Sequence, residues 1–168
     1  MAVSIGRNGL AWGAGEHRVQ APPGFRMKQE GDGCSPAGIF RIPFAFGYAP
    51  TAPGLHLKYV PVTSTLMGVD DAKSLYYNQI VDTASVENGW TSHETMLRED
   101  GLYHWGAFVA HNPTNMPGGG SCIFLHLWRG PGSPTAGCTA MAEEDLIRVL
   151  KWLDPAKEPR LVQGLVAW

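Results

Sequence analysis

One histidine and one cysteine in the C-terminal half are spaced so that they could form a base and a nucleophile. Eleven residues separate His126 from Cys138, three of them glycine and two proline, which lets the chain turn back. A thiol attacks as the thiolate, which an imidazole can generate and a helix N-terminus can stabilise. Because Gly137 and Cys138 come just ahead of a predicted helix, their N–H groups could also bind an oxyanion. The spacing therefore predicts a cysteine-nucleophile enzyme.

Two predicted strands and one helix must position this pair. The segment Cys122–Trp128 is apolar on both faces, as in a central strand, and alternation places His126 on the same face as Cys122. Residues Tyr103–His111 predict a second strand. Apolar residues at helical spacing predict a helix over Met141–Leu153, with acidic residues in its early turns and basic residues later.

The rest of the chain is typical of a β-rich domain with many turns, and we expect one domain over residues 1–168. Glycine and proline together make up about a fifth of the residues (21 and 13 of 168), which is high for a helical protein. Residues Thr63–Thr95 lack a regular pattern and predict a long loop that serves as a lid or binding surface. Other short strands are predicted at Val3–Trp12, His17–Gln20, Ile39–Phe44, Leu55–Val62 and Leu161–Trp168.

Composition argues against several classes of function. The formal net charge is −2 and there is no Lys/Arg run, so nucleic-acid binding and electrostatic membrane attachment lack their usual signature. No apolar stretch approaches the roughly 20 residues that a membrane span needs, and no signal peptide is visible in Met1–Gly15. Three cysteines are too few for a disulfide framework. Cys34 and Cys122 could pair, but we expect independent free thiols, a monomer and no cofactor.

These residues resemble a known family. The stretch from His126 to Thr135-Ala136-Gly137-Cys138-Thr139-Ala140-Met141 is similar to the pattern of the YkuD-like L,D-transpeptidase catalytic domain: a His, a variable loop, then Ser/Thr-His-Gly-Cys. Residues 30–40, Glu-Gly-Asp-Gly-Cys-Ser-Pro-Ala-Gly-Ile-Phe, look like the strand entry of its proteobacterial branch. Weaker similarities occur at Asp70-Asp71, Tyr77-Asn78, Ser92-His-Glu94 and Asn112-Pro113. The likeness runs from about Phe25 to the C-terminus. It implies a mainly β fold, a YkuD-like mixed β-sandwich or sheet with one main helix after the cysteine.

The resemblance implies a role for each matched position. Cys138 would attack a peptide carbonyl in a peptidoglycan stem and form a thioester, and His126 would take the thiol proton. The backbone carbonyl of Leu127 would orient the imidazole, and the N–H groups of Gly137 and Cys138 would stabilise the oxyanion. The implied activity is an L,D-transpeptidase that cross-links stem peptides in the periplasm or cell wall and is a target of carbapenem β-lactams.

Two positions depart from the family pattern. Its second histidine, two residues before the cysteine, is Ala136, and the Arg or Asn often found two residues after the cysteine is Ala140. Binding of a substrate carboxylate must therefore come from elsewhere, and Arg129 is the candidate because a guanidinium can hold a carboxylate through two hydrogen bonds. The other predicted substrate contacts are His111, Tyr77, Glu94 and Thr135.

Three other interpretations stay open. With water as the acceptor, the same thioester chemistry would give an L,D-carboxypeptidase or amidase. The loss of the second histidine at Ala136 favours a non-catalytic cell-wall-binding module. A zinc-dependent hydrolase would need ligands from His104, His111, His126 and Cys138. No pair of these has the tight spacing of a zinc site, so we expect no metal.

Overall fold

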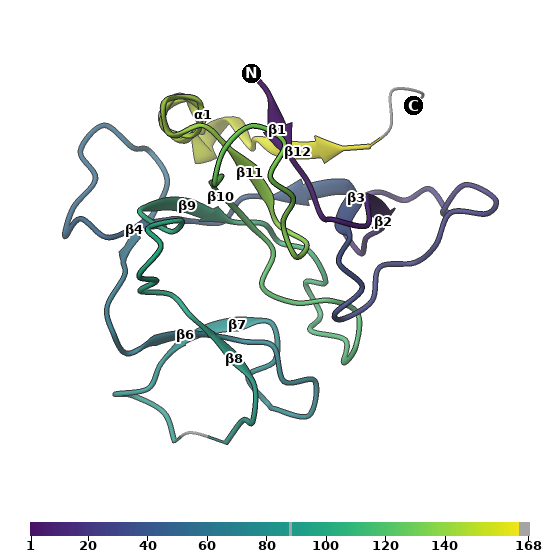
Figure 1. Cartoon of the computed structure of the whole chain (residues 1–168), viewed down its shortest axis with the longest axis horizontal. Coiled ribbons are helices and arrows are strands. Elements are labelled where there is room, and N and C mark those ends of the chain that lie inside the picture. The colour runs from purple at the N-terminus through teal and green to yellow at the C-terminus, as the bar shows by residue number, and fades with distance from the viewer. Residues whose placement is uncertain (88, 165–168) are drawn as a thin grey trace.

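The computed structural model describes residues 1–87 and 89–164, and this part of the chain is mainly β with a single α-helix near its end (Figure 1). The predicted fold class is therefore confirmed. The elements are β1 (Val3–Ser4), β2 (Leu10–Trp12), β3 (Ser35–Arg41), β4 (Ala45–Gly47), β5 (Tyr59–Pro61), β6 (Leu66–Val69), β7 (Gln79–Asp82), β8 (His93–Thr95), β9 (Trp105–Phe108), β10 (Phe124–Leu127), β11 (Thr139–Met141), α1 (Glu143–Trp152), a 3₁₀ turn (Pro155–Lys157) and β12 (Arg160–Gln163).

The central sheet has six strands in the order β1-β11-β10-β9-β4-β5. β10 is antiparallel to β9 and parallel to β11, so that His126 stands opposite Gly106 on one side and Ala140 on the other. Glycine is required at position 106 because a Cβ there would lie 2.3 Å from the ring of Phe46. The sheet thereby brings the histidine strand directly beside the strand that follows Cys138.

Helix α1 covers one face of the central sheet (Figure 1). Leu146 and Leu150 are fully buried against the sheet, where they meet Ala107 and Leu125. Burying a leucine side chain stabilises the fold by about 2 kcal/mol, so this contact fixes the helix to β9 and β10.

The helix begins later than predicted. The expected range was Met141–Leu153, but residues Thr139–Met141 form β11, and α1 starts at Glu143. β11 is extended because its backbone pairs with β10 on one side and with β1 on the other. Tertiary pairing therefore overrides the local helical pattern at this end.

The opposite face of the central sheet buries an aromatic cluster. Phe124 alternates with Leu125 along β10 and so points away from α1, where its ring packs edge-on against Phe46 and Tyr103. The three-stranded sheet β7-β6-β8 lies on this side (Figure 1). The prediction of an irregular loop over Thr63–Thr95 was therefore wrong. Its strands have only three or four residues, too few for alternation to be recognised in the sequence.

A third sheet, β12-β3-β2, holds the two ends of the chain together. The strand predicted at Leu161–Trp168 is present as Arg160–Gln163, and residues 165–168 lie outside the described range. The strand predicted at His17–Gln20 is absent from the described structure. Instead, the Nδ1 atom of His17 accepts a hydrogen bond from the Ile39 amide at 3.1 Å.

Several strands are shorter than predicted, and one difference affects the site. β10 starts at Phe124, and Cys122 lies before it with φ near +50°. Its amide donates to Oδ1 of Asn78 at 2.9 Å rather than to a neighbouring strand. The strand is shorter than predicted, but Cys122 still packs with Phe124 and Cys138 on the face of the sheet away from α1, which is also the face of His126.

Candidate active site

Cys138 lies where two clefts meet. The larger cleft has a volume of about 900 Å³ and the smaller about 170 Å³. Both are lined by Cys138, Glu94, Arg98 and Ala136, and the smaller also by His126. The Cys138 residue is partly exposed, so a substrate can reach it from either side.

The sheet register places the cysteine and the histidine on one face. Ala140 pairs with His126, and the register continues back to place Cys138 opposite Phe124. Residues two apart on a strand share a face, so Cys138 and His126 project from the same side of the sheet at about 8 Å between Cα atoms. The side chains of a histidine and a cysteine are together long enough to come into contact across that separation.

His126 is held in the form that a base requires. Its Nδ1 lies 2.7 Å from the carbonyl oxygen of Leu127. A carbonyl can only accept, so Nδ1 carries the proton and Nε2 keeps its lone pair. Burial, assisted by the positive charge of Arg98, lowers the pKa of His126 below its usual value. The imidazole is therefore neutral near pH 7 and able to take a proton.

The electrostatic surroundings of Cys138 contradict the predicted thiolate. Burial and the nearby Glu94 carboxylate raise the pKa of the thiol to about 12. Its Sγ accepts a hydrogen bond from the Phe124 amide at 3.3 Å and donates to the Cys122 carbonyl at 3.6 Å. No hydrogen bond joins Cys138 and His126, both of which the structure describes. In the free protein Cys138 is a neutral thiol.

Helix α1 does not supply the stabilisation that the sequence suggested for a thiolate. Its N-cap is Ala142, so all of β11 separates the helix from Cys138. The helix also packs on the face of the sheet opposite to the cysteine. Because the dipole effect fades within about one turn, the helix has little influence on the sulfur.

Glu94 is fixed beside the cysteine by two partners. Its Oε1 accepts hydrogen bonds from the Tyr103 hydroxyl at 2.6 Å and from Arg98 at 3.1 Å. Tyr103 in turn packs edge-on against the His126 ring, with 5.4 Å between centroids. Burial raises the pKa of Glu94 above its ordinary value, although Tyr103 and Arg98 oppose the shift. A carboxyl group, a phenol and an imidazole thus converge near one sulfur.

Asp100 ties two arginines to this group. Arg98 donates to both of its carboxylate oxygens, at 2.9 and 2.7 Å, and Arg129 donates to one of them at 2.8 Å. These contacts, with the bonds from Arg98 foremost, hold the pKa of Asp100 far below its usual range. Arg129 lines the smaller cleft and its side chain is 60% exposed, so its remaining donors face solvent.

The turn before Cys138 is organised by Thr135. Its hydroxyl donates to the Cys138 carbonyl at 2.6 Å and accepts from the Gly137 amide at 3.1 Å. Ser35 donates a second hydrogen bond to the same carbonyl, at 2.9 Å. Thr135 lines the smaller cleft, but in the free protein its hydroxyl serves to shape the loop. The Gly137 amide, predicted to bind an oxyanion, is occupied by this threonine.

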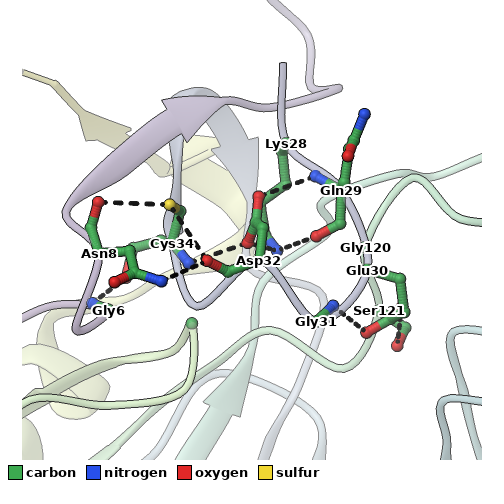
Figure 2. Close-up of polar contacts among 12 residues, drawn as sticks. Gly6, Asn8, Lys28, Gln29, Glu30, Gly31, Asp32, Cys34, Gly120 and Ser121 are labelled. Atoms are coloured by element: carbon green, nitrogen blue, oxygen red, sulfur yellow. Dashed lines mark hydrogen bonds and ion pairs between the residues drawn. The ribbon is translucent and has the colours of Figure 1, made fainter. Parts of the chain in front are cut away.

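A glycine turn adjoins the larger cleft, which Lys28, Glu30 and Gly31 help to line, and Figure 2 shows the hydrogen bonds within this turn. Gly31 and Gly33 both have φ near +70°, a conformation that L side chains rarely adopt. Between them, Asp32 accepts hydrogen bonds from Lys28 Nζ at 2.7 Å and from the Cys34 amide at 2.9 Å. Burial alone would raise the pKa of Asp32, but these bonds lower it. Lys28 lines the cleft with a side chain that is only 4% exposed, and its charge is balanced by Asp32.

Comparison with known proteins now adds to this geometry. A family model described as the L,D-transpeptidase catalytic domain, YkuD, matches residues 1–162. The chain belongs to this family. No curated protein and no solved structure gives a match. Membership supports a peptidoglycan-related, cell-wall-associated function for this L,D-transpeptidase domain.

Two of the predicted substrate contacts lie away from both clefts of the L,D-transpeptidase domain. His111 is 1% exposed, and its Nε2 bonds to the Gly119 carbonyl at 2.9 Å. Tyr77 is 2% exposed and donates to Glu30, a residue of the larger cleft. Burial lowers the pKa of His111 to about 4 and raises that of Tyr77 well above its usual value. Both side chains support the cleft from within the fold.

The zinc ligand set considered from the sequence is not assembled in the L,D-transpeptidase domain. His104 is exposed beside Glu143, whereas His111 is buried elsewhere. Among residues 1–87 and 89–164, no group of three His, Cys, Asp or Glu side chains is placed to hold a metal ion. All three cysteines are free. None of the described helices is both long and apolar enough for a membrane crossing.

Sequence reasoning missed four residues of this site: Lys28, Arg98, Asp100 and Tyr103. One signal was available, because Glu94 is followed at short intervals by Arg98, Asp100 and Tyr103. Such a mixture of opposite charges and a phenol in a weakly patterned segment is typical of a polar network around a site. Nothing in the sequence distinguished Lys28 from a solvated lysine.

Proposed function

We propose that this chain is a single catalytic domain over residues 1–168 that cross-links peptidoglycan stem peptides through a thioester on Cys138. The observation that carries the proposal is the pair formed by Cys138 and His126. They stand on one face of neighbouring strands at an open cleft, and the Leu127 carbonyl leaves His126 Nε2 available as a base. The family match supports the substrate class.

In the first step, the Cys138 sulfur attacks a peptide carbonyl of the donor stem while His126 Nε2 takes the thiol proton. Because the free thiol is neutral, we infer that this proton moves as the S–C bond forms and not before. The N–H groups of Cys138 and Gly137 stabilise the oxyanion, for which the Gly137 amide must leave Thr135. The C–N bond then breaks, His126 returns the proton to the departing amine, and a thioester remains.

In the second step, an amine of another stem attacks the thioester. A C–N bond forms, the C–S bond breaks, and the sulfur regains a proton. Water in place of the amine gives the carboxypeptidase or amidase outcome from the same intermediate. Arg129 is proposed to bind a donor carboxylate with its solvent-facing donors, and Glu94 and Thr135 to line the substrate path. The chemistry requires access to the cell wall, so a periplasmic location is part of the proposal.

The test uses intact-mass analysis of the full chain. Incubation with a carbapenem should add the mass of one β-lactam, mapped by peptide digestion to Cys138. Cys138→Ala should show no addition, while Cys34 and Cys122 remain as internal controls in both proteins. Incubation with purified stem peptides should then yield cross-linked products with the native chain alone.

Two outcomes would overturn the proposal. If the native chain were never acylated by a β-lactam or a stem peptide, the non-catalytic cell-wall-binding interpretation would replace it. If Cys138→Ala kept full cross-linking activity, the nucleophile would lie elsewhere. Hydrolysed stems without cross-links would identify the hydrolase instead.

A further inference from the structure

Glu94 has one carboxylate oxygen anchored and the other free. Oε1 holds both hydrogen bonds of this side chain, from Tyr103 and Arg98, within the part of the chain that the structure describes. Oε2 has no hydrogen-bond partner among those residues. Glu94 lines both clefts together with Cys138. A rigidly held carboxylate therefore presents an unused acceptor to the space in front of the nucleophile.

The part of the larger cleft beside Glu94 favours a cation. Asp70 and Glu99 also line it, and neither has an ion pair with another described residue. The one cation in contact with Glu94 is Arg98, which Asp100 already holds through two hydrogen bonds. Arg7 and Lys28 also line the cleft, and Lys28 is paired with Asp32. The attraction for a cation therefore comes from the Glu94 carboxylate and the nearby Asp70, and it acts at short range. An ammonium group is thus attracted to the side of Cys138 where Oε2 is free.

We propose that Glu94 binds the ammonium group of the acceptor substrate and removes the proton that prevents its attack on the thioester. Glu94 thereby sets the ratio of transfer to hydrolysis, because water carries no charge for it to bind. This inference rests on the proposed thioester chemistry at Cys138. The inference gives Glu94 a role in binding the acceptor substrate, beyond its hydrogen bonds to Tyr103 and Arg98.

The protons balance in this scheme. The acceptor arrives as R–NH₃⁺, and Oε2 of Glu94 takes one proton to leave R–NH₂. The nitrogen attacks the thioester carbonyl, an N–C bond forms and the C–S bond to Cys138 breaks. The second proton passes from nitrogen through His126 to the departing sulfur, and Glu94 later releases its proton to solvent. No additional reactant is needed.

The surroundings of Glu94 suit proton transfer. Burial, together with the charges of Asp70 and Asp100, raises its pKa, while Tyr103 and Arg98 keep it from rising further. A carboxylate with a raised pKa is a stronger base than one with the ordinary pKa. The neighbouring thiol of Cys122 is neutral because burial raises its pKa, and the sulfur of Cys138 is acylated at this step, so neither competes for the proton.

The experiment compares Glu94→Gln with Glu99→Gln in the full chain. Glutamine keeps an oxygen for Tyr103 and Arg98 but cannot accept a proton or bind an ammonium ion as a charge. Glu99 lines the same cleft and is exposed, which makes it the matched control. A synthetic stem peptide serves as donor and glycinamide as the amine acceptor. Mass spectrometry measures thioester formation, amide product and hydrolysed product.

For Glu94→Gln we expect an amide-to-hydrolysis ratio at least about tenfold lower than in the native chain, measured on the thioester that each protein forms. Glu99→Gln should change the ratio less than about twofold. An unchanged ratio in Glu94→Gln would overturn the inference while leaving the proposed function intact. Failure of the native chain to form a thioester would overturn both. If Glu94→Gln did not fold, Glu94→Asp, which keeps the charge, must retain more transfer than Glu94→Ala.

Discussion

The amide of Phe124 donates a hydrogen bond to the sulfur of Cys138 across the β10–β11 boundary, at 3.3 Å. A thiolate is stabilised by such a donor, yet burial and Glu94 outweigh it in the free protein. The resting thiol is therefore a weak nucleophile, and in the proposed mechanism its proton leaves only as the substrate reacts. This relationship leads to the first prediction.

The Cys138 thiol should react slowly with iodoacetamide, and the rate should increase about tenfold per pH unit between about pH 7 and 10. The thiol pKa is about 12, so the thiolate fraction keeps rising throughout that range. Glu94→Gln removes a negative charge near the sulfur, lowers the thiol pKa and should accelerate labelling at fixed pH. Mass spectrometry with Cys138→Ala as background measures both effects. A plateau below about pH 8 would contradict the raised pKa.

His126→Ala should slow thioester formation by about 10²–10⁴-fold while leaving the fold intact. The loss follows because no other described side chain with a free imidazole nitrogen lines the smaller cleft. His104→Ala is the control, since that imidazole is exposed beside Glu143 and should be dispensable. Stopped-flow kinetics measures the rate of acylation of each variant, and circular dichroism shows whether the variant is folded. Equal rates in both variants would remove His126 from the mechanism.

Acylation by a stem peptide should lose half its rate only below about pH 6.5. The imidazole must be neutral to take a proton. Burial is the main cause that lowers its pKa, and the positive charge of Arg98 lowers it further. Protonation on acidification abolishes the base, so a lowered pKa moves the acidic limb of the profile to lower pH. The measurement is the rate of thioester formation across pH under single-turnover conditions. An acidic limb centred above pH 7 would be incompatible with this environment.

Arg129→Ala should raise KM for a donor with a free carboxylate and change stability by less than about 1 kcal/mol. The side chain is 60% exposed and its ion pair with Asp100 lies at the surface, so little folding energy depends on it. Arg148→Ala provides a matched control, because Arg148 is also exposed and paired with a carboxylate, Asp145, on α1. Steady-state kinetics should distinguish the two. Equal KM values would leave Arg129 as a surface residue.

Leu146→Ala should reduce the free energy of unfolding by about 2–5 kcal/mol. Leu146 is fully buried where α1 meets the central sheet, and truncation leaves a cavity there. Leu75→Ala, at a site that is 95% exposed, should change stability by less than about 0.5 kcal/mol. Urea unfolding measures both changes in the free energy of unfolding, from the shift of the midpoint concentration when the dependence on urea (the m-value) stays the same. A small effect at Leu146 would mean that the helix contributes little to the fold.

The helix and the strand carrying His126 were predictable from the sequence. The helix was found because apolar residues repeat at helical spacing, and the strand because it lies in a continuous apolar segment, although only four of its residues are paired. The short β6, β7 and β8 were missed, since their pairing partners and not their own residues make them strands. The helix start predicted at Met141 was wrong for the same reason, because Thr139–Met141 pair with neighbouring strands as β11.

The nucleophile and base could also be named from the sequence, whereas their electrostatics could not. The position of Cys138 near a helix start suggested a thiolate, but the intervening strand reverses that expectation. Glu94 was named only as a substrate contact. Its hydrogen bonds to Arg98 and Tyr103 join side chains four and nine residues further along the chain, and only the fold brings these together.

The residues between His126 and Cys138 form a crossover between two parallel strands that are already fixed by the sheet. β10 is secured by β9, and β11 by β1, independently of that connection. Its two ends are constrained, because the Leu127 carbonyl orients His126 and the Thr135 hydroxyl holds the Cys138 carbonyl. The residues between these ends can vary without moving either reacting atom, and Trp128, Arg129, Ser133 and Pro134 among them shape the smaller cleft. Substrate preference can thus change, in nature or in the laboratory, by replacing one loop while the positions of Cys138 and His126 stay the same.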